Sequence, residues 1–305
     1  MEALAIPLLL FVGSLLAVQA AANVQLAAAT ASPFGASALQ LGVGAAVLLL
    51  AGAVAGSLGA LEALPEVDAW QLAGGLGSAL YITSGIVLFP RLGAVVTVGL
   101  WISGQMLASA AIDAAGLFGS GADGLGAAQL AGAGAVLAAA AMIARSQDGS
   151  GLGVRAIPLV ALALAAGAAL PLQGGVNAEL DAALGEPVAV GLVSFVVATA
   201  AMALLLALSV AIAAARPPAI APLARVPWWA WLGGVVGAAY VTAVFSLIPR
   251  IGAAATIALT VTGQQAASLL VDRYGLLGLP RRAIAPLRVA GIAALFLGVG
   301  LIQFG

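Results

Sequence analysis

The chain has 305 residues, of which 64% are hydrophobic and only 7% charged, and its mean hydropathy is +1.20. Because a soluble protein carries roughly a quarter of its residues charged, this composition excludes an ordinary soluble domain and indicates a protein embedded in a lipid bilayer. The absence of cysteine and histidine and the net charge of −1 exclude disulfides, thiolate or imidazole metal sites, Cys- or His-based catalysis and a basic nucleic-acid surface.

Ten apolar stretches follow one another along the chain, and each is close to the ~20 residues that a membrane-spanning helix needs. They lie at about 4–26, 35–58, 70–89, 92–112 and 126–144, and then at about 156–178, 187–214, 228–248, 251–271 and 285–304. Pro, Gly or charged residues separate them. We predict ten transmembrane helices, in a first unit at 1–145 and a second unit at 156–305, joined by the polar, Gly-rich linker 146–155.

The first stretch can also be read as a signal peptide, because Ala-rich sequence follows an apolar run. No basic residue precedes it, however, and its pattern Gln19-x-x-x-Asn23 recurs as Gln173-x-x-x-Asn177. The recurrence places the stretch inside a repeated unit, so we predict that it is the first membrane helix.

A longer pattern is also written twice. Pro90-Arg91-Leu92-Gly93-Ala94 recurs as Pro249-Arg250-Ile251-Gly252-Ala253, and the same interval separates Trp70 from Trp229, Tyr81 from Tyr240, Gln105 from Gln264 and Asp113 from Asp272. Five spans carry a chain to the other face of the membrane, so the second copy must be inverted. We predict an all-α integral membrane protein with two inverted five-helix repeats, an architecture typical of transporters whose site lies at the repeat interface.

The arginines predict the orientation, because positive residues favour the cytoplasmic side. Nine of the ten basic residues fall in the connections 1–2, 3–4, 5–6, 7–8 and 9–10, and only Arg250 falls on the other side. We therefore expect a multi-pass protein of the plasma or inner membrane, with the arginine-rich face in the cytoplasm and both termini outside.

Two matched amide pairs are the first candidate site. Gln19 and Asn23, like Gln173 and Asn177, are four residues apart and therefore share a helix face. Their amides offer both donors and acceptors, which suits a polar uncharged or zwitterionic ligand. The alternative role is hydrogen bonding between helices.

A second candidate set lies on the third, fourth, eighth and ninth predicted helices. It comprises Tyr81, Trp101, Gln105, Ser109, Tyr240, Thr260, Gln264 and Ser268. Inversion is expected to bring Gln105 and Gln264 together near the midplane. Trp101 is the one tryptophan in mid-span and would pack on a ligand or form a gate, although packing between helices is equally open. For the tyrosines, too, cavity lining and a structural role stay open.

Acidic residues and the Pro-Arg corners complete the candidates. Asp113 and Asp272 end the fourth and ninth predicted helices and are candidates for proton coupling, while a solvated acid at a helix end is the alternative. Pro90, Arg91, Pro249 and Arg250 form short corners between helices. Because the corners lie on opposite faces, we expect a structural role for them rather than ligand binding.

These motifs together resemble a known family. Q-x-x-x-N near the start, a Trp-Gly-Gly-Tyr helix, P-R-x-G-A, G-Q-x-x-A-S and a terminal Asp-x-x-G-L-x-G are similar to the YdcZ-like branch of the drug/metabolite transporter (DMT) superfamily. The resemblance implies a ten-helix DMT (EamA-like) fold from two fused units, with a central cavity lined by helices 1, 3, 4, 6, 8 and 9. It also implies export rather than import. Termini in the superfamily are commonly cytoplasmic, and here the arginine distribution favours the opposite.

We therefore expect a secondary transporter that moves a small polar or zwitterionic metabolite or drug by alternating access, as a monomer or homodimer and without a cofactor or metal. A channel-like facilitator and a non-transport membrane scaffold are the alternatives. An intramembrane enzyme is not expected, because the predicted spans contain no acid–base or metal-binding cluster.

Overall fold

A computed structural model describes residues 2–119, 126–145, 156–212, 217–251, 253–283 and 285–304. These residues form ten α-helices: α1 (Glu2–Thr30), α2 (Pro33–Ala55), α3 (Gly75–Leu92), α4 (Ala94–Ala114), α5 (Ala127–Arg145), α6 (Ile157–Leu184), α7 (Pro187–Ala211), α8 (Leu232–Ile251), α9 (Ala253–Tyr274) and α10 (Pro286–Phe304). Short 3₁₀ helices connect some of them, including Ser57–Glu66 and Ala69–Gly74 before α3.

Six apolar segments are long enough to cross a membrane within the described part of the chain. They correspond to α1, α2, α3 with its preceding 3₁₀ turn, α4, α6 and α7. The other four predicted spans coincide with α5, α8, α9 and α10, which are 19 to 22 residues long. The chain is thus an all-helical membrane protein, and the ten-span count stays a prediction.

Two helix boundaries differ from those expected. α6 continues past Glu179 and Asp181, which the sequence placed in a break, and ends only where Gly185 adopts a left-handed conformation at φ 66°. A glycine there closes the helix at no steric cost. The stretch expected to start near residue 70 begins instead as a 3₁₀ turn, and the α-helix starts at Gly75. The predicted linker 146–155 lies outside the described residues.

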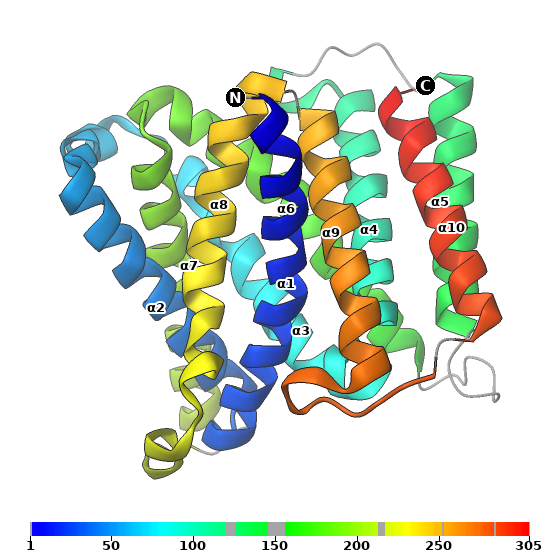
Figure 1. Ribbon diagram of the computed structural model, residues 1–305. Coiled ribbons are helices and arrows are strands. Elements are labelled where there is room, and N and C mark those ends of the chain that lie inside the picture. Colours follow the sequence, from blue (N-terminus) through cyan, green and yellow to red (C-terminus); the bar gives the residue numbers. More distant parts are fainter. Residues whose placement is uncertain are drawn as a thin grey trace.

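The helices form one bundle in which helices of the two halves pack side by side (Figure 1). α5 packs on α10 at one edge, α2 packs on α7 at the opposite edge, and α1 and α4 pack on α9 and α6 between them. Both labelled chain ends lie at one end of the bundle, while the α9–α10 connection lies at the other (Figure 1).

Glycines allow the central helices to touch backbone to backbone. On the α1–α9 crossing, Gly13 faces the backbone of Thr260 and Gly263 faces that of Leu10. The α4–α6 crossing has the same design at the matched positions, with Gly167 against Trp101 and Gly104 against Leu164. No side chain fits at these glycines, so small residues set the distance between the helices, as is usual where lipid removes the hydrophobic drive for packing.

Candidate functional site

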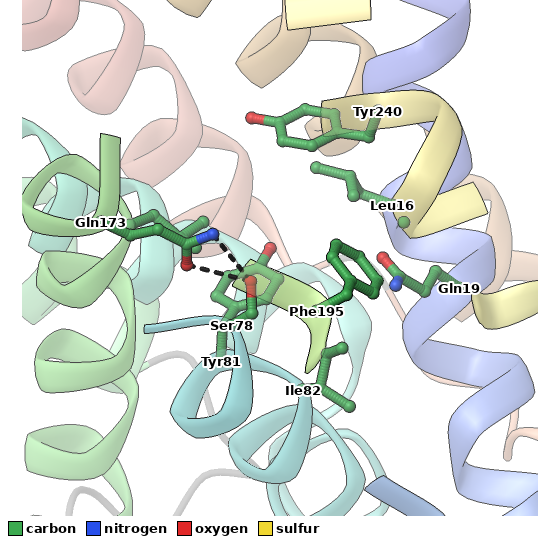
Figure 2. A pocket seen from close by; sticks show the side chains of 10 residues that line it. Leu16, Gln19, Ser78, Tyr81, Ile82, Gln173, Phe195 and Tyr240 are labelled. Carbon is green, nitrogen blue, oxygen red and sulfur yellow. Dashed lines mark hydrogen bonds between the residues drawn. The ribbon is translucent and has the colours of Figure 1, made fainter. Parts of the chain in front are cut away.

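A cavity of about 50 Å³ lies where the two halves meet, between α1, α3, α6, α7 and α8 (Figure 2). Its lining residues are Leu16, Gln19, Ser78, Tyr81, Ile82, Leu170, Gln173, Phe195, Gly237 and Tyr240. Four of the candidate residues thus surround one space, which has room for a few waters. None of the lining side chains is charged, so the chemistry here is that of neutral hydrogen bonding.

A smaller pocket of about 10 Å³ continues from this cavity along α1 toward α4. It shares Gln19 and Tyr81 with the cavity and adds Asn23, Gly85 and Trp101. Six candidates from the sequence therefore lie around this pair of spaces, which we call the central cavity.

The two matched glutamines of the central cavity have different neighbours. Gln173 Nε2 donates to Ser78 Oγ at 2.8 Å, and the Ser78 hydroxyl lies 2.9 Å from Gln173 Oε1 (Figure 2). Gly237 stands at the matched position beside Gln19, with no side chain to bond. Among the described residues that line the cavity, none forms a hydrogen bond with Gln19 (Figure 2). Within the cavity, Gln19 therefore lacks the serine neighbour that holds Gln173.

Ser78 was not singled out from the sequence, although a signal existed. It precedes Tyr81 by three residues and so shares its helix face. The serine is missing from the second half, however, so a search for matched residues passes over it. The ring of Phe195 of α7 also lines the cavity (Figure 2).

Trp101 forms the floor of the central cavity and is fully buried. Its ring lies 4.1 Å from that of Tyr81 at 35° and 5.5 Å from that of Phe89, and its indole N–H donates to Ser84 Oγ at 3.1 Å. Aromatic pairs in such tilted contact add stability beyond their buried area. This packing favours the structural reading of Trp101, with one edge of the ring reaching the smaller pocket.

Two tyrosine hydroxyls connect the cavity to α9. Gln264 Nε2 donates to the Tyr81 hydroxyl at 2.6 Å, and the Thr260 side chain bonds to the Tyr240 hydroxyl. Gln264 is thus turned toward α3, and the expectation that Gln105 and Gln264 lie together stays a prediction. Ser268 is fully buried and donates to Gln265 O on its own helix, while Ser109 is half-buried on α4.

The two asparagines lie against the starts of α3 and α8. Asn177 Oδ1 lies against Gly74 and accepts from Ser194 Oγ at 2.7 Å, and Asn23 Oδ1 lies against the matched Gly233. Gln40 matches Ser194 but bonds to the backbone instead, donating to Ala230 O at 2.6 Å. The asparagines thus sit at the junction of the halves, and Asn23 also reaches the smaller pocket.

Asp272 lies at the α3–α4 corner, away from the residues that line the central cavity. Its Oδ1 accepts from Ala94 N at 2.8 Å and its Oδ2 accepts from Val95 N at 3.0 Å. These are the first amides of α4, which have no partner in their own helix, and a carboxylate also suits the positive end of the helix dipole. Gly93 makes the corner possible at φ 82°. Asp272 therefore caps a helix of the other half.

Arginines close the same corner. Arg282 donates through its backbone N–H to Asp272 O at 2.8 Å and through Nη2 to Pro90 O at 3.1 Å. Arg91 donates to Val87 O of its own helix at 2.6 Å. The contacts agree with a structural role for Pro90 and Arg91. The side chains of their matched residues Pro249 and Arg250, and that of Asp113, lie outside the described part of the structure.

Comparisons with known proteins agree with this architecture. A sequence model of the family described as "Putative inner membrane exporter, YdcZ" matches the chain twice, over residues 4–142 and over residues 158–301. Among curated proteins, no sequence matches the chain. A crystal structure of another protein aligns with 95% of this chain and 95% of its own, at a TM-score of 0.55 and 18% identity, which shows a shared fold.

Proposed function

We propose that this protein, which belongs to the YdcZ family of inner membrane exporters, exports a small uncharged or zwitterionic metabolite or drug through the central cavity by alternating access. The observation that carries the proposal is the Gln19 amide, which is 4% exposed and unpaired among the lining residues of a cavity between the two halves. This amide offers a donor and an acceptor to the cavity, and a ligand with polar groups would pair with it.

The directions of two matched helices support this mechanism. The end of α9 lies at the start of α4, because Asp272 bonds to Ala94 and Val95 there. The matched helices α4 and α9 therefore run in opposite directions, as inversion requires and as a parallel repeat would forbid. We infer two inverted family units, with the division at 146–155 as a working boundary.

The small size of the cavity supports an alternating mechanism rather than an open pore. Its volume of about 50 Å³ is small for a metabolite, so loading requires the helices to move apart. Phe195 separates the cavity from Gly44 of α2, which makes α7 and α2 the gate we propose. Flux that saturates and shows counterflow is expected, whereas flux that does not saturate would indicate a channel.

The orientation follows from the arginine-rich face. Arg91 and Arg282 meet at the α3–α4 corner, and Ala219 N bonds to Thr30 O at 2.9 Å, which brings the α7–α8 connection to the end of α1. The ends of these elements therefore share one face. We propose that this face is cytoplasmic and that both termini are extracytoplasmic. An alkaline phosphatase fused to the C-terminus should be active, and activity of a cytoplasmic reporter there would contradict the proposal.

Proton coupling through Asp113 and Asp272 remains a proposal to be tested. The cap formed by Asp272 ties its carboxylate to α4, so release of that cap is the step that would have to accompany protonation. Transport in liposomes should then follow an imposed pH gradient. A rate that does not depend on pH would remove both acids as carriers and leave Asp272 as a cap.

The main experiment compares the two glutamines in purified protein. A thermal-shift screen against small metabolites identifies a ligand, and counterflow in liposomes then measures its transport. Gln19→Ala should abolish ligand-dependent stabilisation, whereas Gln173→Ala, which removes an amide already bonded to Ser78, should weaken it less, and the double variant should match Gln19→Ala. Unchanged binding in the double variant would overturn the assignment of the site.

A further inference from the structure

A second hollow lies on the outside of the bundle, between the start of α3 and the second half of α6. This groove encloses about 250 Å³, and its walls include Leu76, Gly77 and Leu80 from α3 and Leu172 and Val176 from α6. Leu76 is 51% exposed and Leu172 is 46% exposed. Apolar side chains exposed on membrane-spanning helices face lipid, so the groove opens onto the hydrocarbon of the bilayer.

Gln173 is the one polar side chain among the residues that line this groove, and it also lines the central cavity. Its hydrogen bonds to Ser78 place the pair between the two spaces. A rotation of this one side chain, with loss of the bonds to Ser78, would join the groove to the cavity. The groove and the proposed transport site thus share one polar side chain, that of Gln173.

One wall of the groove contains a glycine that the other half lacks. A Cβ added at Gly77 would lie 2.8 Å from Ala169 O and 2.8 Å from Gln173 Oε1. The matched position on α8 holds Val236, whose branched side chain is buried. The outer wall differs less, because the position matched to Leu172 on α1 holds the shorter apolar residue Val18. Gly77 therefore lets α3 approach the backbone of α6 closely beside the groove, whereas the matched position in the other half carries a side chain.

We propose that this groove admits the apolar chain of an uncharged amphiphile directly from the bilayer, while Gln173 binds its polar head group on the way to the central cavity. The inference rests on the transport function proposed above and names a substrate class for it. A chain that moves from lipid into an apolar groove loses no apolar contact. A neutral head with a donor and an acceptor, such as a primary amide, can pair with the glutamine amide.

Charged heads do not fit this path. The residues that line the groove carry no charge, so a carboxylate or an ammonium group that entered by this path would lie unpaired in apolar surroundings, which is unfavourable. A head group that lacks any polar atom would gain nothing from Gln173. The site therefore selects for uncharged amphiphiles.

The test is photolabelling of the full chain in phospholipid liposomes, using dodecanamide that carries a diazirine in its alkyl chain. Mass spectrometry should locate adducts on the groove residues of α3 and α6, and excess dodecanamide should suppress them. Dodecane and dodecanoate should need at least about tenfold higher concentrations for the same suppression of labelling. This ratio corresponds to a difference of about 1.4 kcal/mol in binding free energy. Adducts spread equally over other lipid-facing helices would overturn the proposal, as would groove adducts that dodecanamide does not displace, which would indicate a resident lipid.

Two variants make the test specific. Leu172→Trp fills the groove from its lipid-facing wall and should lower groove labelling about tenfold or more, while the control Leu204→Trp, at a site on α7 that is 60% exposed, should leave it unchanged. Gln173→Leu should keep the labelling but abolish the advantage of dodecanamide over dodecane. Equal labelling in Leu172→Trp and Leu204→Trp would overturn the groove assignment.

The two proposals fail in different ways. If Leu172→Trp blocks labelling while a water-soluble ligand still undergoes counterflow, the groove serves only amphiphiles, as proposed. If the groove labels as expected while no ligand undergoes counterflow, the binding inference stands and the transport function is overturned. If dodecanamide undergoes counterflow equally well with Leu172→Trp, lateral entry is overturned and the transport function stands.

Discussion

The two family units place the same glutamine on the same helix but give it different surroundings. Gln173 is held by Ser78, whereas Gln19 faces Gly237 and stays unpaired within the cavity. A duplicated unit that kept both halves identical would have two equal amides. The comparison teaches that the two halves share a backbone design but differ at one neighbour, a serine beside one glutamine and a glycine beside the other.

The largest expected effect comes from the matched pair Trp101 and Thr260. Trp101→Ala should lower stability by about 3–5 kcal/mol, because it removes a fully buried ring stacked on Tyr81 and leaves a cavity. Thr260→Ala removes far less volume and should cost about 1 kcal/mol. Thermal unfolding in detergent measures both. Equal losses of stability in the two variants would show that Trp101 and Thr260 contribute equally to the stability of the protein.

The next effect concerns the cap across the halves. Asp272→Ala leaves two buried amides of α4 without their acceptor and should lower stability by about 2–4 kcal/mol. Glu66→Ala, at an exposed site in the connection before α3, is the control and should change stability by less than about 0.5 kcal/mol. A loss in Asp272→Ala no greater than in the control would contradict the capping role.

Exchanging the neighbours of the two glutamines tests whether the serine beside Gln173 and the glycine beside Gln19 determine which amide binds the ligand. Gly237→Ser places a hydroxyl beside Gln19 and should weaken ligand binding about tenfold, because the amide then has a partner already. Ser78→Gly frees Gln173 and should leave binding unchanged or strengthen it. Thermal shift with the ligand measures both variants. Weaker binding in Ser78→Gly than in Gly237→Ser would reverse the assignment.

The smallest expected effect is at the two tyrosines. Tyr81→Phe removes the acceptor of the buried Gln264 amide and should cost about 1–2 kcal/mol, whereas Tyr240→Phe, on a half-buried side chain, should cost about 0.5–1 kcal/mol. Chemical denaturation of the detergent-solubilised protein resolves the difference. A greater loss of stability in Tyr240→Phe would show that the hydrogen bond of Tyr240 contributes more than that of Tyr81.

Much of the fold could be predicted from the sequence because lipid imposes simple rules. Apolar stretches near the length of a bilayer become helices, and Pro33, Gly185 and Pro187 mark the ends of helices through backbone chemistry alone. The extension of α6 past Glu179 and Asp181 was not predicted, since acids at a helix end resemble acids in a loop when only hydropathy is considered.

The candidate site was predictable in part. Gln19, Tyr81, Gln173 and Tyr240 line one cavity, and they were found because polar residues in apolar helices are few and recur in both copies. Ser78 and Gly237 were missed because they differ between the copies. The meeting of Gln105 and Gln264 stays a prediction from symmetry, and symmetry does not determine which way each side chain turns.

The sequence by itself determined that this protein is a duplicated, membrane-embedded helical unit with neutral amides in its interior. Composition and repetition decide these points, because burying a charge in lipid is costly wherever it lies. Only the tertiary structure decided that Asp272 caps α4 of the other half, that Trp101 packs on Tyr81, and that Gln173 is tied while Gln19 is unpaired within the cavity. These contacts join residues far apart in the chain, and the short side-chain distances that make or break a hydrogen bond leave no trace in the pattern of one sequence.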